Sequence, residues 1–241
     1  MIEKKIHYCW FGGKELPELA KKCIASWKKY CPDYEIVEWN ETNYDLCKNE
    51  YVKYTYEHKL YAFLTDYVRL DVIDQQGGIY LDTDVELLKP IDDLLECKAF
   101  MGLEAIGQVN TGLIFGAIKH HNFIKENKKY YENLSFLDED GNFRRINCVS
   151  ITTDLLRKYG FKDEDKIQEV REVTIYPIQY FCPLDYASNI LNVTKNTYSI
   201  HWYSGAWLNL KDKIKQKCGR AIYKIFGKKK YYQIKKKLLK R

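Results

Sequence analysis

The stretch from Gly77 to Glu86, GGIYLDTDVE, constrains the fold of this chain more than any other. Two glycines end a helical segment, and Ile79–Leu81 predict a short buried strand that stops at Asp82 and Asp84. If the strand continued, alternation would point both carboxylates to the same side. Burying two like charges without a partner costs several kcal/mol, and a divalent cation removes that cost. The stretch therefore predicts a metal site that presents a phosphorylated ligand.

The beginning of the chain predicts a strand, a helix and a second strand, the opening of a nucleotide-binding α/β unit. The strands are expected over Lys5–Trp10 and Tyr34–Trp39, and the helix over Pro17–Tyr30. A GxGxxG motif does not follow the first strand, which argues against a dinucleotide fold of that fingerprint. Trp10 ends the first strand, where open α/β sheets bind ligands, so it either stacks on a nucleobase or packs against the following loop.

The rest of the body predicts further helices and strands. The expected elements are a helix over Glu57–Gln76, strands over Val85–Leu88, Ala99–Glu104 and Val109–Ala117, a helix over His121–Asn133, a helix opened by Ser150–Asp154 with Thr or Asp as its cap, and a strand-like run over Thr174–Pro183 that is broken by Pro177. Asn110 enters its strand through a polar turn and is either structural or substrate-binding.

Three further polar residues are candidates for the site at Asp82 and Asp84. Asp66 and Arg69 share a helix face close to the aspartate strand, although a surface ion pair is the simpler interpretation. His201 lies in the aromatic run SIHWY and is by default a packed core residue. It becomes a candidate ligand because the metal site needs more than two carboxylates and imidazole suits a cation such as Mn²⁺.

The charge of the chain is divided unevenly. Residues 211–241 hold 14 of the 39 basic residues and one of the 33 acidic ones, which leaves residues 1–210 with a net charge of −7. We therefore predict a domain over 1–210 and a tail of basic amphipathic helices over 211–241 that lies on anionic membrane. Nucleic-acid binding is disfavoured by the acidic body, and a solvated helix is the plain alternative.

The length of 241 residues allows one large α/β domain or at most two small ones, and the 46% hydrophobic content indicates a globular chain with a real core. The eight cysteines include no CxxC pair, so neither a zinc site nor a disulfide framework is expected. Neither a signal peptide nor a spanning helix is predicted. The expected location is the cytoplasm, peripheral on the inner face of the plasma membrane.

Four blocks of this sequence resemble a known family. They are Lys5–Gly13, Ala62–Arg69, Gly77–Asp84 and His201–Trp207, and they occur in the same order as in DXD-containing glycosyltransferases of the family-32 type. That type includes bacterial capsular and lipopolysaccharide sugar transferases and yeast mannosyltransferases. The glucosylating domains of the large clostridial toxins are more distantly similar.

The resemblance implies a GT-A type, Rossmann-like α/β fold with a central mixed sheet. It also implies transfer of a hexose or N-acetylhexosamine from a nucleotide sugar, with a UDP-sugar favoured, and with retention of configuration. The cofactor would be Mn²⁺ or Mg²⁺, and the acceptor a glycan or lipid-linked glycan in surface polysaccharide synthesis. Departure of the diphosphate needs its growing charge neutralised, which such a cation does.

The resemblance also assigns roles to individual residues. For the nucleotide and the donor sugar, Trp10 would stack on the base, Asp66 and Arg69 would hold the ribose and the donor sugar, and Asn110 would touch the donor sugar. For the metal, Asp82 and Asp84 would bind the ribose and the ion, and His201 would complete the metal site. Ser204 and Trp207 would steady the leaving diphosphate, and Asp154 would lie near the reacting face. Asp84, Asn110 and Asp154 are the residues expected to act in catalysis. Residues Ile151–Asp154 depart from the family, where many relatives carry a Gly-Pro pair.

Three other interpretations of the two aspartates were compared. A haloacid-dehalogenase-like phosphatase is disfavoured because Glu86 stands where that motif has Thr or Val. A calcium loop is disfavoured because Leu87 stands at the glycine position. A non-catalytic sugar-nucleotide- or glycan-binding protein of the same fold remains the alternative.

Overall fold

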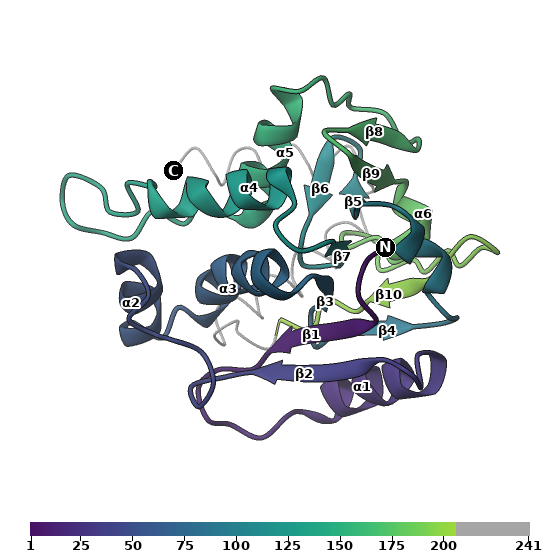
Figure 1. Ribbon diagram of the computed structural model, residues 1–241, viewed down its shortest axis with the longest axis horizontal. Helices are drawn as coiled ribbons and strands as arrows, with labels where there is room; N and C mark the ends of the chain where they lie inside the picture. The colour runs from purple at the N-terminus through teal and green to yellow at the C-terminus, as the bar shows by residue number, and fades with distance from the viewer. Residues whose placement is uncertain (206–241) are drawn as a thin grey trace.

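The computed structural model describes residues 1–205, which form an α/β domain around a mixed sheet (Figure 1). In chain order its elements are β1 (Lys5–Cys9), α1 (Glu18–Tyr30), β2 (Glu35–Trp39), α2 (Glu50–Glu57), α3 (Tyr61–Gln76), β3 (Gly78–Leu81), β4 (Val85–Leu87), the 3-10 helix η1 (Asp92–Glu96), β5 (Ala99–Ala105), β6 (Gln108–Asn110), β7 (Ile114–Ala117), α4 (Asn122–Glu132), α5 (Cys148–Arg157), β8 (Gln168–Val170), β9 (Val173–Tyr176), α6 (Ile178–Phe181) and β10 (Ser199–His201).

The main sheet has the strand order β2-β1-β3-β7-β5-β9-β8, with β6 beside β5. Strand β1 runs parallel to β2 and β3, and β5 runs parallel to β9, whereas β7 is antiparallel to both of its neighbours. The predicted α/β class with a central mixed sheet is therefore confirmed. The predicted boundary at residue 210 and the predicted helices over 211–241 lie outside the described residues.

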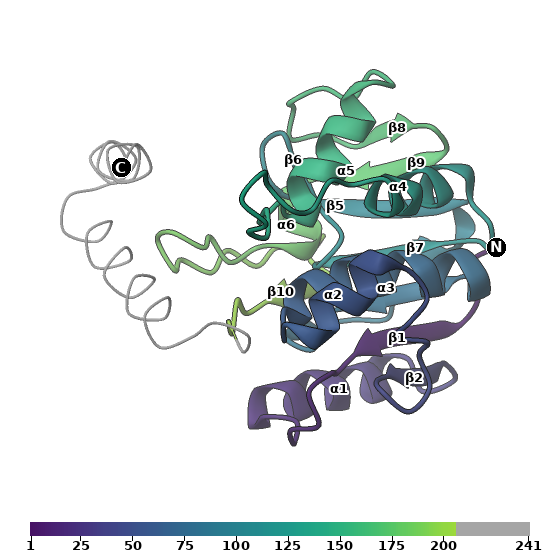
Figure 2. The same ribbon diagram turned by 90° about the vertical axis from the view of Figure 1, so that its left-hand side faces the viewer.

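The core has two parts, one on each face of the sheet. Alternating strand residues divide between them, so that Tyr80 packs with helices α2 to α5 while Ile79 and Leu81 pack with α1, η1 and α6. Figure 2 shows helices α2 and α3 alongside β1, and β10 at the end of the molecule toward which β1 points. The strand tips at that end therefore carry the candidate site.

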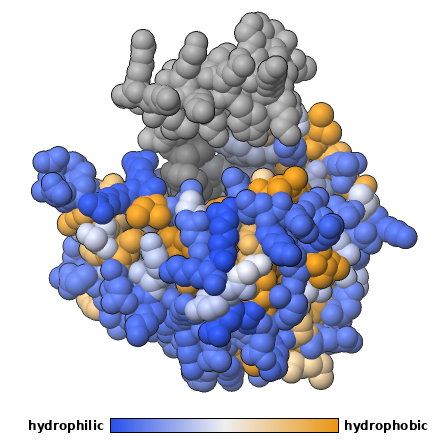
Figure 3. Space-filling model, turned by 90° about the horizontal axis from the view of Figure 1, so that it is seen from above, coloured by the Kyte–Doolittle hydropathy of each residue, from blue (hydrophilic) through white to orange (hydrophobic). Residues whose placement is uncertain are grey.

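The surface over α4 and α5 is mostly hydrophilic, with separate apolar patches, when the molecule is viewed from above (Figure 3). All seven cysteines among residues 1–205 are free thiols. Within the same residues, no helix is both long enough and apolar enough to span a bilayer.

Four predicted elements were wrong in detail. The helix expected over Glu57–Gln76 begins only at Tyr61, as α3, because Lys59 adopts a left-handed backbone (φ 57°) that separates it from α2, a helix over Glu50–Glu57 that was not expected. The strand expected over Val109–Ala117 is interrupted between β6 and β7 by a turn in which the N–H of Leu113 donates to the carbonyl of Asn110 (3.4 Å).

The other two corrections concern helix starts. Helix α5 is capped by Asn147, whose side chain accepts from the N–H of Ser150, so Asp154 lies inside the helix and not at its cap. The strand-like run expected over Thr174–Pro183 does break at Pro177, but the part after the break is helix α6 and not strand, because proline fits before the first turn of a helix.

His7 joins the first strand to the glycine pair that precedes the aspartates. Its Nε2 donates to the carbonyl of Gly77 (3.0 Å), and its Nδ1 accepts from Nε1 of Trp39 (3.0 Å). This pair of partners requires the neutral ring. Gly78 (φ 97°) lies so close that a Cβ there would be 2.7 Å from the carbonyl oxygen of Lys5. The glycine is therefore required both by its backbone angle and by the neighbouring strand.

We predict that the His7 ring makes folding stability depend on pH. Burial lowers the pKa of His7 from 6.5 to about 4. The unfolded chain therefore binds the extra proton between these values, and stability falls as the pH drops from 6.5 toward 4, by about 3 kcal/mol at most. Denaturant unfolding measured across this range should show the slope.

The matched variant is His7→Gln, which can hydrogen-bond but does not titrate in this range. The difference between the wild-type and variant pH profiles isolates the contribution of His7 from that of other groups. Parallel profiles between pH 4 and 6.5 would contradict the prediction.

Candidate active site at the end of strand β3

The structure brings Asp82, Asp84 and His201 together. Strand β3 ends at Leu81, and a turn follows in which the N–H of Val85 donates to the carbonyl of Asp82 (3.0 Å). Strand β4 then pairs antiparallel with β10 so that Val85 lies opposite His201 (Figure 1). One ligand atom from each of the three residues lies within 4.8 Å of the others. The predicted cluster therefore forms through a turn and not through a continuing strand.

Asp84 is held as an anion. Nε2 of His201 lies 3.2 Å from Oδ1 of Asp84, and the backbone N–H of Ser204 donates to Oδ2 (2.8 Å). Burial alone would raise the pKa of Asp84, but His201 and the Ser204 N–H outweigh it and hold that pKa well below its usual range. Burial lowers the pKa of His201 and Asp84 raises it by more, so its pKa lies above the usual value.

Asp82 is held differently, by a buried arginine. Its Oδ1 accepts from the Tyr80 hydroxyl (3.1 Å) and lies 3.4 Å from Nη2 of Arg69. The same Nη2 lies 3.1 Å from Oδ1 of Asp66, and Nε of Arg69 donates to the carbonyl of Thr65 (3.0 Å). Arg69 is 3% exposed, so the interpretation of a surface ion pair with Asp66 is wrong.

The electrostatics of the two aspartates differ because of these partners. Burial raises the pKa of Asp82, Arg69 opposes it, and the nearby charge of Asp84 raises it further. Burial also raises the pKa of Asp66 to about 6, against the effect of Arg69. One guanidinium thus serves two carboxylates that are more easily protonated than usual, while Asp84 stays ionised.

Asn110 and Gly112 close the site on the side of β6. The N–H of Gly112 donates to Oδ1 of Asn110 (2.6 Å), and Nδ2 of Asn110 donates to Oε2 of Glu104 (2.6 Å). A Cβ at Gly112 would lie 2.6 Å from Oδ2 of Asp82 and 2.9 Å from Nη1 of Arg69. The turn therefore packs directly against the Asp82 carboxylate, which places Asn110 beside it.

The donor set fits a hard or borderline divalent cation. Two carboxylates and one imidazole suit Mn²⁺ or Mg²⁺ better than a thiolate-binding metal. Nδ1 of His201 is buried and has no hydrogen-bond partner within the described part of the chain, so the ring is positioned by packing and by Asp84.

The sequence of this region matches a described family. Residues 17–101, which contain the two aspartates, match the glycosyltransferase sugar-binding region containing DXD motif. Among similar curated proteins, mannosyl phosphorylinositol ceramide synthase SUR1 of Saccharomyces cerevisiae is 27% identical over 57% of this chain and 37% of its own length. Inositol phosphoceramide mannosyltransferase 3 of Schizosaccharomyces pombe is 30% identical over 51% of this chain and 35% of its own length.

These matches support a glycosyltransferase of the DXD type. The chain covers little more than a third of either yeast relative. Among solved structures, a glycosyltransferase involved in glycosylation of the major capsid of PBCV-1 is similar over 89% of this chain and 98% of that chain, with 13% identity and a TM-score of 0.45. The narrower resemblance to the family-32 type, to capsular enzymes and to toxin domains stays a prediction.

The remaining residues with predicted roles lie as follows. Trp10 is half-buried after β1, and its Nε1 donates to the carbonyl of Lys14 (2.5 Å). Ser204 meets Asp84 through its backbone N–H. Trp207 lies outside the described residues. The roles given to these residues stay predictions.

Asp154 lies apart from the cluster. It is on the exposed face of α5, where its side chain is 69% exposed and its Oδ1 lies 2.8 Å from Nη1 of Arg157. It lines a small pocket of about 140 Å³ that shares Tyr130, Leu155 and Lys158 with a larger one. None of the hydrogen bonds or ion pairs of Asp154 within residues 1–205 joins it to Asp82, Asp84 or His201.

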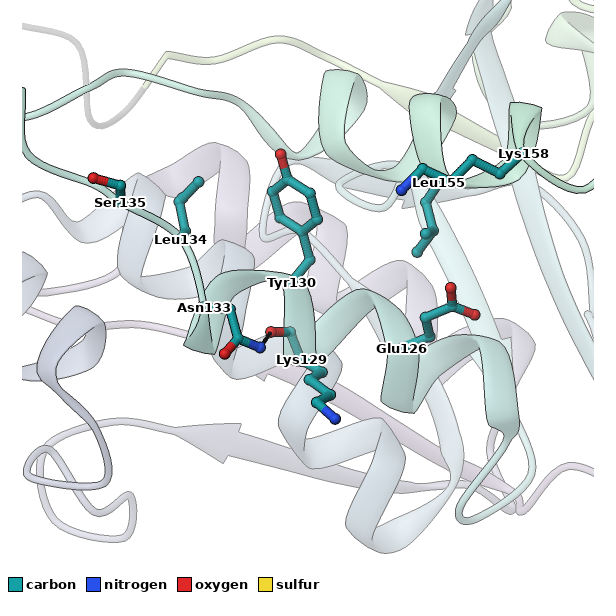
Figure 4. A pocket seen from close by; sticks show the side chains of 8 residues that line it. All are labelled: Glu126, Lys129, Tyr130, Asn133, Leu134, Ser135, Leu155 and Lys158. Atoms are coloured by element: carbon teal, nitrogen blue, oxygen red, sulfur yellow. Dashed lines mark hydrogen bonds between the residues drawn. The ribbon is translucent and has the colours of Figure 1, made fainter.

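The larger pocket, of about 460 Å³, lies between α4 and α5 (Figure 4). It is lined by Glu126, Lys129, Tyr130, Asn133, Leu134, Ser135, Leu155 and Lys158. None of these has a predicted role and none belongs to the candidate metal site, so this pocket is separate from it.

Sequence reasoning missed three residues of this site. Glu104 ends a predicted strand and Gly112 follows Asn110, so both stood in segments that the sequence had singled out. Cys148 gave no local signal, yet its Sγ lies 3.9 Å from Nη1 of Arg69 and 3.7 Å from Oδ1 of Asn110.

We predict that Gly112→Ala disturbs the site through volume alone. Its Cβ would meet Asp82 and Arg69 at distances that force one of them to move, which typically costs about 1–3 kcal/mol. Denaturant unfolding should show this loss. Gly141→Ala is the comparison, because its Cβ would have nothing within 4 Å and only its left-handed backbone (φ 78°) is strained. Full stability of Gly112→Ala would contradict the packing described here.

Proposed function

We propose that this protein is a metal-dependent glycosyltransferase that uses a nucleotide-sugar donor. One observation carries the proposal: Asp82, Asp84 and His201 converge at a strand tip within a region that matches DXD-containing glycosyltransferases. The aspartates lie at the carboxyl end of β3, the edge at which open α/β sheets hold ligands.

Asp84, His201 and Asp82 would hold Mn²⁺ or Mg²⁺. When bound, such an ion offsets the negative charge that develops on the departing diphosphate. Asp84 suits this task because its partners keep it ionised. The backbone N–H of Ser204 keeps Oδ2 of Asp84 oriented, and the pairing of β4 with β10 keeps His201 beside it.

The other residues of the site would orient the donor. Arg69 holds the carboxylates of Asp66 and Asp82 in place for the ribose and the donor sugar. Trp10, fixed through its Nε1 at the end of β1, offers a ring for the base. We propose retention of configuration, with departure and attack on the same face of the sugar. The anomeric configuration of the product, read by NMR, tests this point.

We propose a glycan or a lipid-linked glycan as the acceptor, in surface polysaccharide synthesis. Two relatives carry names that describe mannosyl transfer to inositol phosphoceramide, which favours a lipid-borne acceptor as the second candidate. Either kind of lipid-linked acceptor fits a peripheral location on the inner face of the plasma membrane. The sugar we propose is a hexose or N-acetylhexosamine from a UDP-sugar.

Asp84→Asn should abolish metal-dependent hydrolysis of the donor without unfolding the protein. The substitution removes the ligand charge, and metal stabilisation of the leaving group contributes several kcal/mol, so a loss of at least about 100-fold is expected. The assay is release of nucleoside diphosphate from a panel of UDP- and GDP-sugars with Mn²⁺, and with EDTA as the metal-free reference.

Asp33→Asn is the control, because Asp33 is an exposed carboxylate paired with Lys4 on the surface. It should keep the parental rate. Parental turnover by Asp84→Asn would contradict the metal site. Tight donor binding with no turnover of any sugar by the wild-type protein would favour the non-catalytic alternative.

The full chain should bind vesicles that contain anionic lipid and not purely zwitterionic ones. This follows from the basic residues of 211–241, which anionic lipid head groups attract electrostatically. The attraction falls off within a Debye length, so salt weakens it. Flotation at rising salt should show release. Replacing Lys235, Lys236 and Lys237 with glutamine should weaken binding and leave donor hydrolysis intact. Equal binding to both vesicle types would contradict membrane attachment through this segment.

A further inference from the structure

Glu104 stands at an irregularity in the sheet, next to the candidate site. In the β5–β6 ladder Leu103 pairs with Val109 and Ala105 pairs with Gln108, so Glu104 is an extra residue between two paired positions. Such bulges redirect a side chain and are common next to active sites. Here the Glu104 carboxylate accepts from Nδ2 of Asn110 at 2.6 Å.

The amide of Asn110 is held from both ends. An ionised carboxylate only accepts hydrogen bonds and a backbone N–H only donates them. Glu104 therefore requires Nδ2 on its side, and the Gly112 N–H requires Oδ1 on the other (2.6 Å). Asn110 is 7% exposed, so little solvent competes for these bonds. The two partners together select one orientation of the amide.

This amide faces the candidate site. The Cβ position of Gly112 lies 3.0 Å from Oδ1 of Asn110 and 2.6 Å from Oδ2 of Asp82, which makes the amide a neighbour of the DXD carboxylate. Glu104 is therefore linked through Asn110 to the turn that packs against Asp82.

We propose that Glu104 is a positioning residue of the donor-sugar subsite, which holds the Asn110 amide in one orientation toward the transferred sugar. This inference rests on the proposed glycosyltransferase function. Glu104 acts through Asn110 and takes no part in bond making.

A double-mutant cycle on metal-dependent donor hydrolysis tests the proposal. Glu104→Ala should lower kcat about 10- to 100-fold with KM changed little, because a misoriented contact is lost at the reacting sugar. Glu104→Gln should recover kcat to within about threefold of wild type, since its amide oxygen can accept the same bond. The double variant with Asn110→Ala should be no slower than Asn110→Ala alone. Losses that multiply would overturn the proposal.

Glu172→Ala is the matched control. Glu172 is an exposed carboxylate between β8 and β9 that pairs with Lys98, and its loss should leave kcat and KM unchanged. A large effect at Glu172 would show that the loss at Glu104 is a general effect of removing a charge, and would also overturn the proposal.

A second readout does not need turnover. The side-chain amide signal of Asn110 in a ¹⁵N–¹H spectrum, assigned by its loss in Asn110→Ala, should shift strongly in Glu104→Ala and little in Glu104→Gln. An unmoved signal in Glu104→Ala overturns the pairing. If the signal moves while the wild type hydrolyses no nucleotide sugar, the proposed function fails and the Glu104–Asn110 pairing stands.

Discussion

The candidate site depends on one buried guanidinium. Arg69 lies between the carboxylates of Asp66 and Asp82, and without it these two like charges would face each other unpaired. The Thr65 carbonyl accepts a hydrogen bond from Nε of the arginine within its own helix, and a side chain at position 112 would collide with its Nη1. The positions of the first DXD aspartate and of the Asn110 turn both follow from this charge. Asp84, which has its own partners, is free to serve a cation.

A second constraint acts along the backbone. Helix α3 and strand β3 are joined through two glycines, and the neutral His7 ring bonds the first of them to the neighbouring strand. The close approach of Lys5 and Gly78 sets where β3 begins. The strand is short and ends at Leu81, directly before Asp82. The aspartates therefore emerge at the edge of the sheet and not within it. Core residues pack against the strand on both faces of the sheet.

The pKa values of the two aspartates are shifted in opposite directions, and the cause is electrostatic. Asp84 accepts a backbone N–H and faces an imidazole, so its charged form is favoured even though it is buried. Burial raises the pKa of Asp82, the arginine that it shares with Asp66 opposes this, and the charge of Asp84 raises the pKa further. The protonated form of Asp82 is therefore more favourable than that of Asp84. Two carboxylates of the same kind thus differ in how readily they take up a proton, which is the property that the proposed metal site would use.

The local features of the site follow from the amino-acid sequence alone. The buried strand with aspartates at its tip, and the Asp66–Arg69 pair three residues apart on one helix, follow from periodicities within a few residues. The α/β order was also visible there. The breaks at Lys59 and between β6 and β7 were not, because each depends on backbone angles or turns that residue type alone does not specify.

Contacts between residues far apart in the sequence depend on the tertiary structure. The register of β4 against β10 brings His201 to Asp84, and the bulge beside β6 brings Glu104 to Asn110. The Asp66–Arg69 pair, which the sequence suggests as a surface ion pair, is buried at the centre of the site, whereas Asp154 is exposed to solvent. Spacing along a chain reports which side chains share a face. Long-range strand pairing and packing determine which faces come together and which charged side chains become buried and desolvated.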